Sequence, residues 1–204
     1  MNDLRRTVLP LMLLGDNQVG KTSMILNIIG KEFNDNQLTT VGKESYLYQA
    51  NIKGYDLKIK IWDPAGQERF KSLSVQVIKN SDAVMLVYAV NEKKTLLDLN
   101  NWLTKISDVS DLSKKPIIVI GNKADITDGR EVKYEEGKQF AEEKGYKYFE
   151  TSAKTGEGIK EAFNEICNQL FDIYELEITG KKKEETKGQK LNTNKDKKKK
   201  KRFC

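Results

Sequence analysis

The sequence predicts an α/β domain in which a mostly parallel sheet carries helices on both faces. Continuous apolar runs at residues 8–14, 83–90 and 116–120 have the length of strands and the composition of strands that are buried on both sides. Segments with helical spacing alternate with these runs, and such alternation is typical of a parallel sheet wrapped by helices. A chain of 204 residues is long enough for one such domain and short for two.

The elements follow in order along the chain. The strand 8–14 contains Pro10 only near its start, where proline is tolerated, and we expect a helix over 21–29. Residues 44–53 and 55–62 flank Gly54 and predict two strands joined by a tight turn. A sixth strand is expected over 146–151. Two further segments have apolar residues at helical spacing: Leu96, Leu99, Leu103 and Ile106, and later Ile159, Phe163, Ile166 and Leu170.

The positive charge of the chain is concentrated near its C-terminal end. Residues 181–202 contain eleven Lys and one Arg against three acidic residues, a net charge of +9, so the whole-chain value of +6 leaves −3 for the remainder. From Thr179 onward there is almost nothing apolar to bury. This predicts a domain over 1–178 and a disordered tail over 179–204. A basic run attached to a near-neutral body indicates an acidic partner, either a membrane or a nucleic acid.

Cysteine and histidine usage limits the chemistry. Only Cys167 and Cys204 are present, so no disulfide framework is predicted and a reducing compartment such as the cytosol is expected. No segment approaches the roughly 20 apolar residues that span a bilayer, and the N-terminus lacks the pattern of a signal peptide. Because the chain contains no His, any bound metal is expected to be a hard cation held by oxygen ligands.

Residues 15–22, GDNQVGKT, match the phosphate-binding loop and lie between a predicted strand and a predicted helix. Its glycines let backbone N–H groups point at phosphate oxygens, while the helix that follows presents its positive end. We expect Lys21 to reach the outer phosphates and the Thr22 hydroxyl to bind magnesium. A plain glycine turn before a helix is the alternative, and the motif alone does not choose between ATP and GTP.

Residues 122–125, NKAD, follow the strand 116–120, at the end where wound α/β sheets bind ligands. The Asp125 carboxylate can accept two hydrogen bonds from the guanine edge, whose donors adenine lacks. Against adenine this carboxylate would be left buried and unpaired, at a cost of several kcal/mol. On its own the tetrapeptide would be a surface turn, but in register with the phosphate loop it predicts guanine.

Five segments make the chain similar to the small GTPases of the Ras superfamily, and most similar to the Rab family. The resemblance covers about residues 9–171 and rests on 15–22, TVG at 40–42, WDPAGQERF at 62–70, 122–125 and ETSAK at 150–154. It implies a P-loop NTPase G domain, with a mostly parallel six-stranded sheet, one antiparallel edge strand and helices on both faces. It also implies a GTP/GDP switch that hydrolyses GTP slowly and regulates vesicle and membrane trafficking. Another Ras-superfamily GTPase, of signalling or nuclear type, is the alternative.

The resemblance assigns roles to individual residues. Thr40 would ligate magnesium only when the third phosphate is present, so that loss of this phosphate releases the loop. Asp63 would hold magnesium through water, the Gly66 N–H would contact the γ-phosphate, and Gln67 would orient the attacking water as the catalytic residue. Phe33 would stack on guanine, with core anchoring as the alternative.

The base would also receive the Ala153 N–H, with Lys154 packing nearby. The predicted nucleotide site comprises Asn17, Gln18, Val19, Gly20, Lys21, Thr22, Ser23, Phe33, Thr40, Gly66, Asn122, Lys123, Asp125, Ser152, Ala153 and Lys154, and the predicted magnesium ligands are Thr22, Thr40 and Asp63.

Several positions depart from the family pattern. Asn17 and Gln18 stand where relatives usually carry Gly, Ser or Ala. Pro64 replaces the usual Thr, which fixes one φ angle and removes an N–H, so we expect slower hydrolysis than the family norm. Ser45 replaces a Phe, and residues 77–81 replace an aromatic stretch, so that Trp62 alone remains of the apolar effector surface of Rab proteins.

Partners follow from the same resemblance. Arg69 belongs to the second switch segment and Arg130 to a predicted loop, so no built-in arginine finger is expected. An activating protein that supplies one accelerates such reactions by roughly 10³ to 10⁵. An exchange factor, effectors and an escort or dissociation-inhibitor protein are implied as well.

The C-terminal residue Cys204 is the predicted site of geranylgeranylation, with an unmodified thiol as the alternative. It is not part of a four-residue prenylation box. The basic run 197–202 would supply the second signal that attaches the chain peripherally to an anionic membrane on its cytosolic face.

Two other classes of protein share part of the pattern. A nucleotide kinase or ATPase also begins with a phosphate loop but would lack the NKAD segment. A nuclear or nucleic-acid-binding protein would suit the basic tail. That tail has no aromatic residues interleaved with its lysines except Phe203, so base stacking is unsupported and no nucleic-acid partner is expected.

Overall fold

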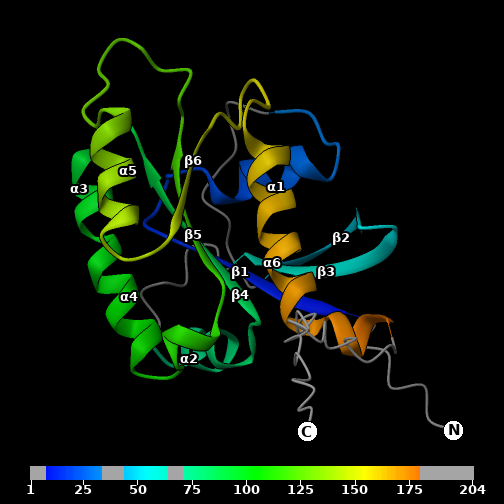
Figure 1. Cartoon of the computed structure of the whole chain (residues 1–204). Helices are drawn as coiled ribbons and strands as arrows, with labels where there is room; N and C mark the ends of the chain where they lie inside the picture. Colours follow the sequence, from blue (N-terminus) through cyan, green and yellow to red (C-terminus); the bar gives the residue numbers. More distant parts are fainter. Residues whose placement is uncertain (1–7, 34–43, 64–70, 180–204) are drawn as a thin grey trace, which may run out of the picture.

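The structure is a computed structural model that describes residues 8–33, 44–63 and 71–179. Within these ranges six strands form one sheet in the order β2-β3-β1-β4-β5-β6 (Figure 1). Their bounds are β1 Leu9–Leu14, β2 Glu44–Ile52, β3 Tyr55–Asp63, β4 Ala83–Ala89, β5 Ile117–Asn122 and β6 Lys147–Thr151. Strand β2 pairs antiparallel with β3, and every other pair is parallel. The predicted six-stranded sheet with one antiparallel edge strand is therefore confirmed.

Helices cover both faces of this sheet, as predicted. One face carries α1 (Lys21–Ile28) and α6 (Ile159–Thr179), whose side chains share a core cluster. The other carries α2 (Lys71–Asn80), α3 (Lys93–Leu97), α4 (Leu99–Ser107) and α5 (Tyr134–Glu142). Alternate side chains of a strand point to opposite faces, so Leu11 and Leu13 enter the first core while Met12 and Leu14 enter the second.

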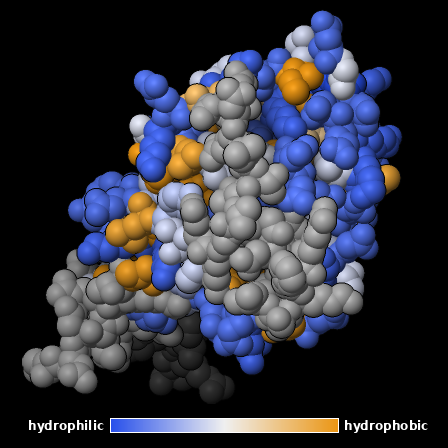
Figure 2. Space-filling model, turned by 180° about the vertical axis from the view of Figure 1, so that it is seen from behind, coloured by the Kyte–Doolittle hydropathy of each residue, from blue (hydrophilic) through white to orange (hydrophobic). Residues whose placement is uncertain are grey.

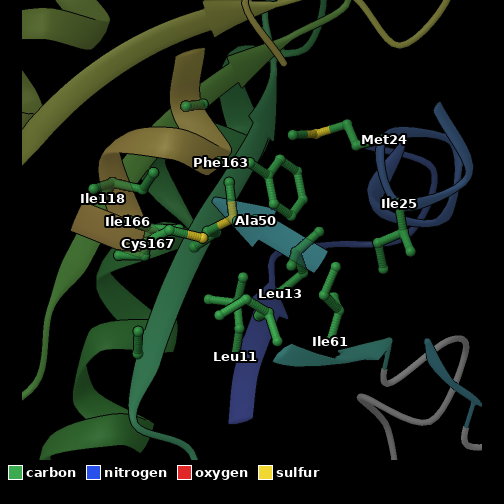
Figure 3. Packing of buried hydrophobic residues seen from close by; sticks show 14 of the residues in the cluster. Leu11, Leu13, Met24, Ile25, Ala50, Ile61, Ile118, Phe163, Ile166 and Cys167 are labelled. Carbon is green, nitrogen blue, oxygen red and sulfur yellow. The ribbon is translucent and has the colours of Figure 1, made fainter. Parts of the chain in front are cut away.

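The first core fixes the helix that follows the phosphate loop. Phe163, Ile166 and Cys167 of α6 pack against the strands, and Met24 and Ile25 of α1 close the same cluster (Figure 3). The Cys167 side chain is fully buried, and burial raises the pKa of its thiol to about 12. This cysteine is therefore a packing residue that stays protonated at neutral pH.

Some elements differ from the sequence expectation. The single helix expected around 96–106 is two short helices, α3 and α4, that meet at Asp98. Helices α2 and α5 were not predicted. In α5 the buried residues are only Gly137 and Ala141, so the sequence has no stripe of large apolar side chains that would predict this helix.

Strand β5 runs two residues further than predicted, because Gly121 and Asn122 continue the ladder with Tyr88 and Ala89. Helix α6 ends at Thr179, one residue beyond the predicted domain end, with non-helical angles at Tyr174. The tail predicted to be disordered lies, from residue 180 on, outside the described residues.

In the described part of the chain, no helix combines the length and the hydropathy that a membrane crossing requires. The face opposite to the view of Figure 1 is mostly hydrophilic where it is described, and hydrophobic residues form small patches on it (Figure 2).

Candidate functional site

The predicted site segments meet at one edge of the sheet. The phosphate loop follows β1, residues 123–125 follow β5, and residues 152–154 follow β6. These strands run parallel with β4 between β1 and β5, so their carboxyl ends share one edge. Ligands of open α/β sheets bind at this edge.

Two glycines give the phosphate loop its close packing. An ideal Cβ on Gly15 would lie 1.9 Å from the Val87 carbonyl oxygen, and one on Gly20 would lie 2.2 Å from the Asn122 amide nitrogen. Gly20 also has a φ of 96°, in the left-handed region that favours glycine. Gln18 has a φ of 60° in the same region, although it is not a glycine.

The Lys21 ammonium lies inside the curve of this loop. It donates hydrogen bonds of 2.8 Å to the Gly15 carbonyl and 2.7 Å to the Asp16 carbonyl, and the side chain is buried. Helix α1 begins at Lys21, so the positive end of its dipole points into the same loop. A cation and a helix N-terminus that face one concave loop are suited to a phosphate chain.

Thr22 and Asp63 bring a hydroxyl and a carboxylate together beside the loop. The Thr22 hydroxyl donates a hydrogen bond of 2.5 Å to the Asp63 carboxylate at the end of β3, which is fully buried. Mg²⁺ in phosphate-binding sites takes one or two protein oxygens and completes its shell with phosphates and water. The two oxygen groups of this pair fit that ion. The structure thus brings together two of the three residues predicted to bind magnesium.

Asn122 joins the phosphate loop to the loop after β6. Its side chain is buried; its amide nitrogen donates to the Val19 carbonyl at 2.8 Å, and its oxygen accepts from the Thr151 hydroxyl at 3.1 Å and the Ala153 N–H at 3.2 Å. The Ala153 N–H, which we expected to face the base, thus contacts Asn122 in this structure. Its role toward the base stays a prediction.

Asp125 is exposed at this edge and is oriented by a neighbouring loop. The Ser152 hydroxyl donates a hydrogen bond of 2.6 Å to one Asp125 oxygen and accepts one from the Thr155 N–H at 3.1 Å. The Ala124 N–H donates to the Thr151 carbonyl at 3.0 Å, which closes the two loops on each other. Lys123 between them has a φ of 66°, and burial lowers the pKa of its ammonium.

The remaining predicted residues are placed as follows. Phe33 is 38% exposed and belongs to neither core cluster, so the core-anchoring alternative is wrong. Lys154 is exposed, and Asn17 and Ser23 are half-buried. Thr40, Pro64, Gly66, Gln67 and Cys204 lie outside the described residues.

Two groups of contacts that hold the site were not predicted from the sequence. The Trp102 indole donates to the Asp16 carboxylate of the phosphate loop at 3.0 Å. Burial raises the pKa of Asp16, and the hydrogen bond from Trp102 opposes this rise. No spacing rule could have found this pair, because the two residues are 86 positions apart.

The second group of contacts lies at β6 and supports the segment 150–154, which is predicted to bind the base. The Tyr88 and Tyr148 hydroxyls are 2.7 Å apart, Tyr148 also donates to the Glu150 carboxylate at 3.0 Å, and Arg130 forms an ion pair with Glu150. Arg130, which had no predicted role, is thus a fixed part of the support for the 150–154 segment. In the sequence, the one signal for this ion pair was Glu150, the first residue of the ETSAK segment.

Fold and site together define a P-loop nucleotide-binding domain of the α/β class. The Ras family matches residues 10–172. Ras-related protein RABG3f of Arabidopsis thaliana is 39% identical over 183 residues, which cover 87% of this chain and 89% of that protein. Rab7 of Pisum sativum is also 39% identical with the same coverage, and Rab-2B of Dictyostelium discoideum is 36% identical over 78% of this chain and 79% of its own.

The chain belongs to the Ras family. It is a divergent Rab-like small GTPase, and thus a GTP-hydrolysing molecular switch, as the sequence resemblance implied.

Proposed function

We propose that the described loops bind one guanine nucleotide together with Mg²⁺, and that hydrolysis of the bound GTP resets the switch. The observation that carries this proposal is the set of three hydrogen bonds of the Asn122 side chain, which donates one to Val19 and accepts those from Thr151 and Ala153, because they join the phosphate loop to the loop after β6. A site built this way would bind the phosphates and the base of one nucleotide at the same edge of the sheet.

The phosphate end of the site would be made by Lys21 and the start of α1. Lys21 is held within the loop by two carbonyls, and it would turn from them to the outer phosphates when the nucleotide binds. Thr22 and Asp63 would hold the magnesium ion, which when bound neutralises charge on the phosphates. Asn17, Gln18, Val19, Gly20 and Ser23 would line this end of the site.

The base end of the site would select guanine. Ser152 holds one oxygen of Asp125, so the carboxylate is oriented before the base arrives. A carboxylate in a fixed orientation can accept two hydrogen bonds from guanine, which adenine does not offer. Lys123, Lys154 and the Phe33 ring would cover the base, and Ala153 would offer its N–H to it.

The switch and the chemistry would depend on residues outside the described ranges. Thr40 would contact magnesium only with GTP bound, Gly66 would contact the γ-phosphate, and Gln67 would orient the attacking water. An activating protein would supply the missing arginine, and an exchange factor would release the product GDP.

In the cell, the switch would regulate vesicle and membrane trafficking. Lipid on Cys204 and the basic run 197–202 would attach it to the cytosolic face of a membrane, after delivery by an escort or dissociation-inhibitor protein. Cell fractionation tests this attachment: the parent is expected partly on membranes, Cys204→Ser in the soluble fraction, and a variant with residues 197–201 neutralised between the two. A Cys204→Ser protein that remains on membranes like the parent would overturn the lipid anchor.

Nucleotide binding is tested with the purified full chain and a fluorescent GDP analogue in millimolar Mg²⁺. Excess GDP or GTP is expected to displace the analogue, whereas the same concentration of ATP is not. Removal of Mg²⁺ with a chelator should accelerate release, and Thr22→Asn should show fast release even with Mg²⁺ present. Equal competition by ATP would contradict the base assignment, and release that does not respond to Mg²⁺ would contradict the Thr22–Asp63 site.

A further inference from the structure

The phosphate loop carries a carboxylate that the proposed chemistry does not use. Asp16 follows Gly15 in the loop, and its side chain accepts a hydrogen bond of 3.0 Å from Trp102 of helix α4, whereas Lys21 bonds only to its main-chain carbonyl. A negative group beside a phosphate chain is unfavourable unless it is held by a donor of its own. The indole N–H of Trp102 is such a donor.

Trp102 is built firmly into the second core. It is 4% exposed and packs in the cluster that includes Leu99, Leu103 and Ile106 of the same helix. The Lys105 ammonium lies over its ring, 3.9 Å from the ring centre. The indole is therefore a fixed reference point to which the loop is attached, and not a mobile surface residue.

The attachment leads to Lys21 through one residue. The Asp16 side chain bonds to Trp102, while the Asp16 carbonyl accepts the Lys21 ammonium at 2.7 Å. Fixing the side chain also limits rotation of the Asp16 peptide group that receives Lys21. Burial and the nearby carboxylate of Asp98, at the junction of α3 and α4, raise the pKa of Asp16, and Asp98 is itself paired with Lys94.

We propose that Trp102 is a positioning residue for the phosphate loop, which it holds through the Asp16 carboxylate so that Lys21 and the loop amides keep the geometry that binds phosphate. The inference rests on the proposed nucleotide site. It adds helix α4 to the elements that set the lifetime of the bound nucleotide.

Release of the fluorescent GDP analogue from the full chain tests the proposal. Trp102→Phe keeps an aromatic ring but removes the N–H, and it should accelerate release by about tenfold, since hydrogen bonds to charged groups are among the stronger ones. Asp16→Ala should have a similar effect, and the double variant should be no faster than the faster single variant. Asp16→Asn keeps a neutral acceptor and should restore most of the slow release.

Two control variants separate positioning from simple loss of stability. Leu103→Val weakens the packing of α4 without touching Asp16, and Lys105→Met removes the ammonium that lies over the Trp102 ring. Both should release the analogue at the parent rate. Thermal unfolding of all variants without nucleotide shows how far each one is destabilised.

The outcomes are distinct. Release from Trp102→Phe at the parent rate, additive effects in the double variant, or an equal acceleration by Leu103→Val would each overturn the positioning role while leaving the nucleotide site intact. Failure of the parent itself to bind the guanine analogue would overturn the proposed function, and the inference with it.

Discussion

The Asn122 amide donates a hydrogen bond of 2.8 Å to the Val19 carbonyl, so the end of β5 and the phosphate loop are held as one unit. Asn122→Ala would leave Val19, Thr151 and Ala153 without these bonds in a buried position. We expect a loss of about 2–4 kcal/mol in the free energy of unfolding. Urea unfolding without nucleotide measures it, and a loss below about 0.5 kcal/mol would contradict the structural role of this residue.

Ser152 orients Asp125, and its removal should weaken guanine binding. Ser152→Ala deletes the 2.6 Å hydrogen bond, and we expect affinity for GDP to fall by roughly threefold to tenfold, as for loss of one bond to a charged group. Equilibrium titration with the GDP analogue measures the change. Thr155→Ala is the matched control, because the hydrogen bond from Thr155 to Ser152 comes from its backbone N–H, which the substitution keeps. Unchanged affinity in Ser152→Ala would contradict the orienting role.

The buried tyrosine pair predicts a loss of stability at high pH. Burial raises the pKa of Tyr88 from about 10 to about 12, so the folded state favours the neutral phenol. This contribution is complete below pH 10 and is lost as the pH rises toward 12, at about 1.4 kcal/mol per pH unit. Since Tyr148 donates to Glu150, Tyr88 donates to Tyr148 in the neutral pair; the hydrogen bond between the two hydroxyls lowers the pKa of Tyr88 and so opposes part of the rise that burial causes.

The measurement is urea unfolding between pH 9 and 12 for the parent, Tyr88→Phe and Tyr134→Phe. Lysines titrate in the same range in all three proteins, so only differences are interpreted. The parent should lose about 2 kcal/mol more than Tyr88→Phe, whereas Tyr134→Phe, altered at an exposed tyrosine, should follow the parent. Parallel curves for the parent and Tyr88→Phe would refute the assignment.

The strained backbone at Gln18 predicts a stabilising substitution. Its φ of 60° disfavours a residue with a side chain, and glycine adopts this region without a steric penalty. The greater freedom of glycine in the unfolded chain offsets part of the gain. We therefore expect Gln18→Gly to stabilise the protein by about 0.5 kcal/mol, as a rise in thermal midpoint of the nucleotide-free protein, and a fall would show that the side chain makes a compensating contact.

Much of the fold and of the site was predictable from the sequence. The apolar runs that became β1, β4 and β5 are buried on both faces, and this is the situation in which a continuous run predicts a strand directly. The loop 15–22 and the segment after β5 carry their chemistry in adjacent residues, so spacing alone locates them.

The contacts that hold the site together were not predictable in this way. Trp102 and Asp16 come from distant parts of the chain, and a core tryptophan at helical spacing does not reveal that its N–H faces a loop. The same holds for Tyr88 and Tyr148, which come together only because β4, β5 and β6 are neighbours in the sheet. Helix α5 was missed because it approaches the sheet through Gly137, which lies against the two tyrosine hydroxyls.

The base preference of Asp125→Asn tests the central claim most directly. The substitution turns part of the acceptor into a donor, so the variant should lose GDP affinity and gain affinity for xanthosine diphosphate, whose ring carries a carbonyl where guanine has an amino group. Competition against a fluorescent nucleotide, with the parent measured in parallel, gives both affinities. We predict a reversed order of preference between the two nucleotides. An unchanged preference for GDP in Asp125→Asn would contradict the guanine site.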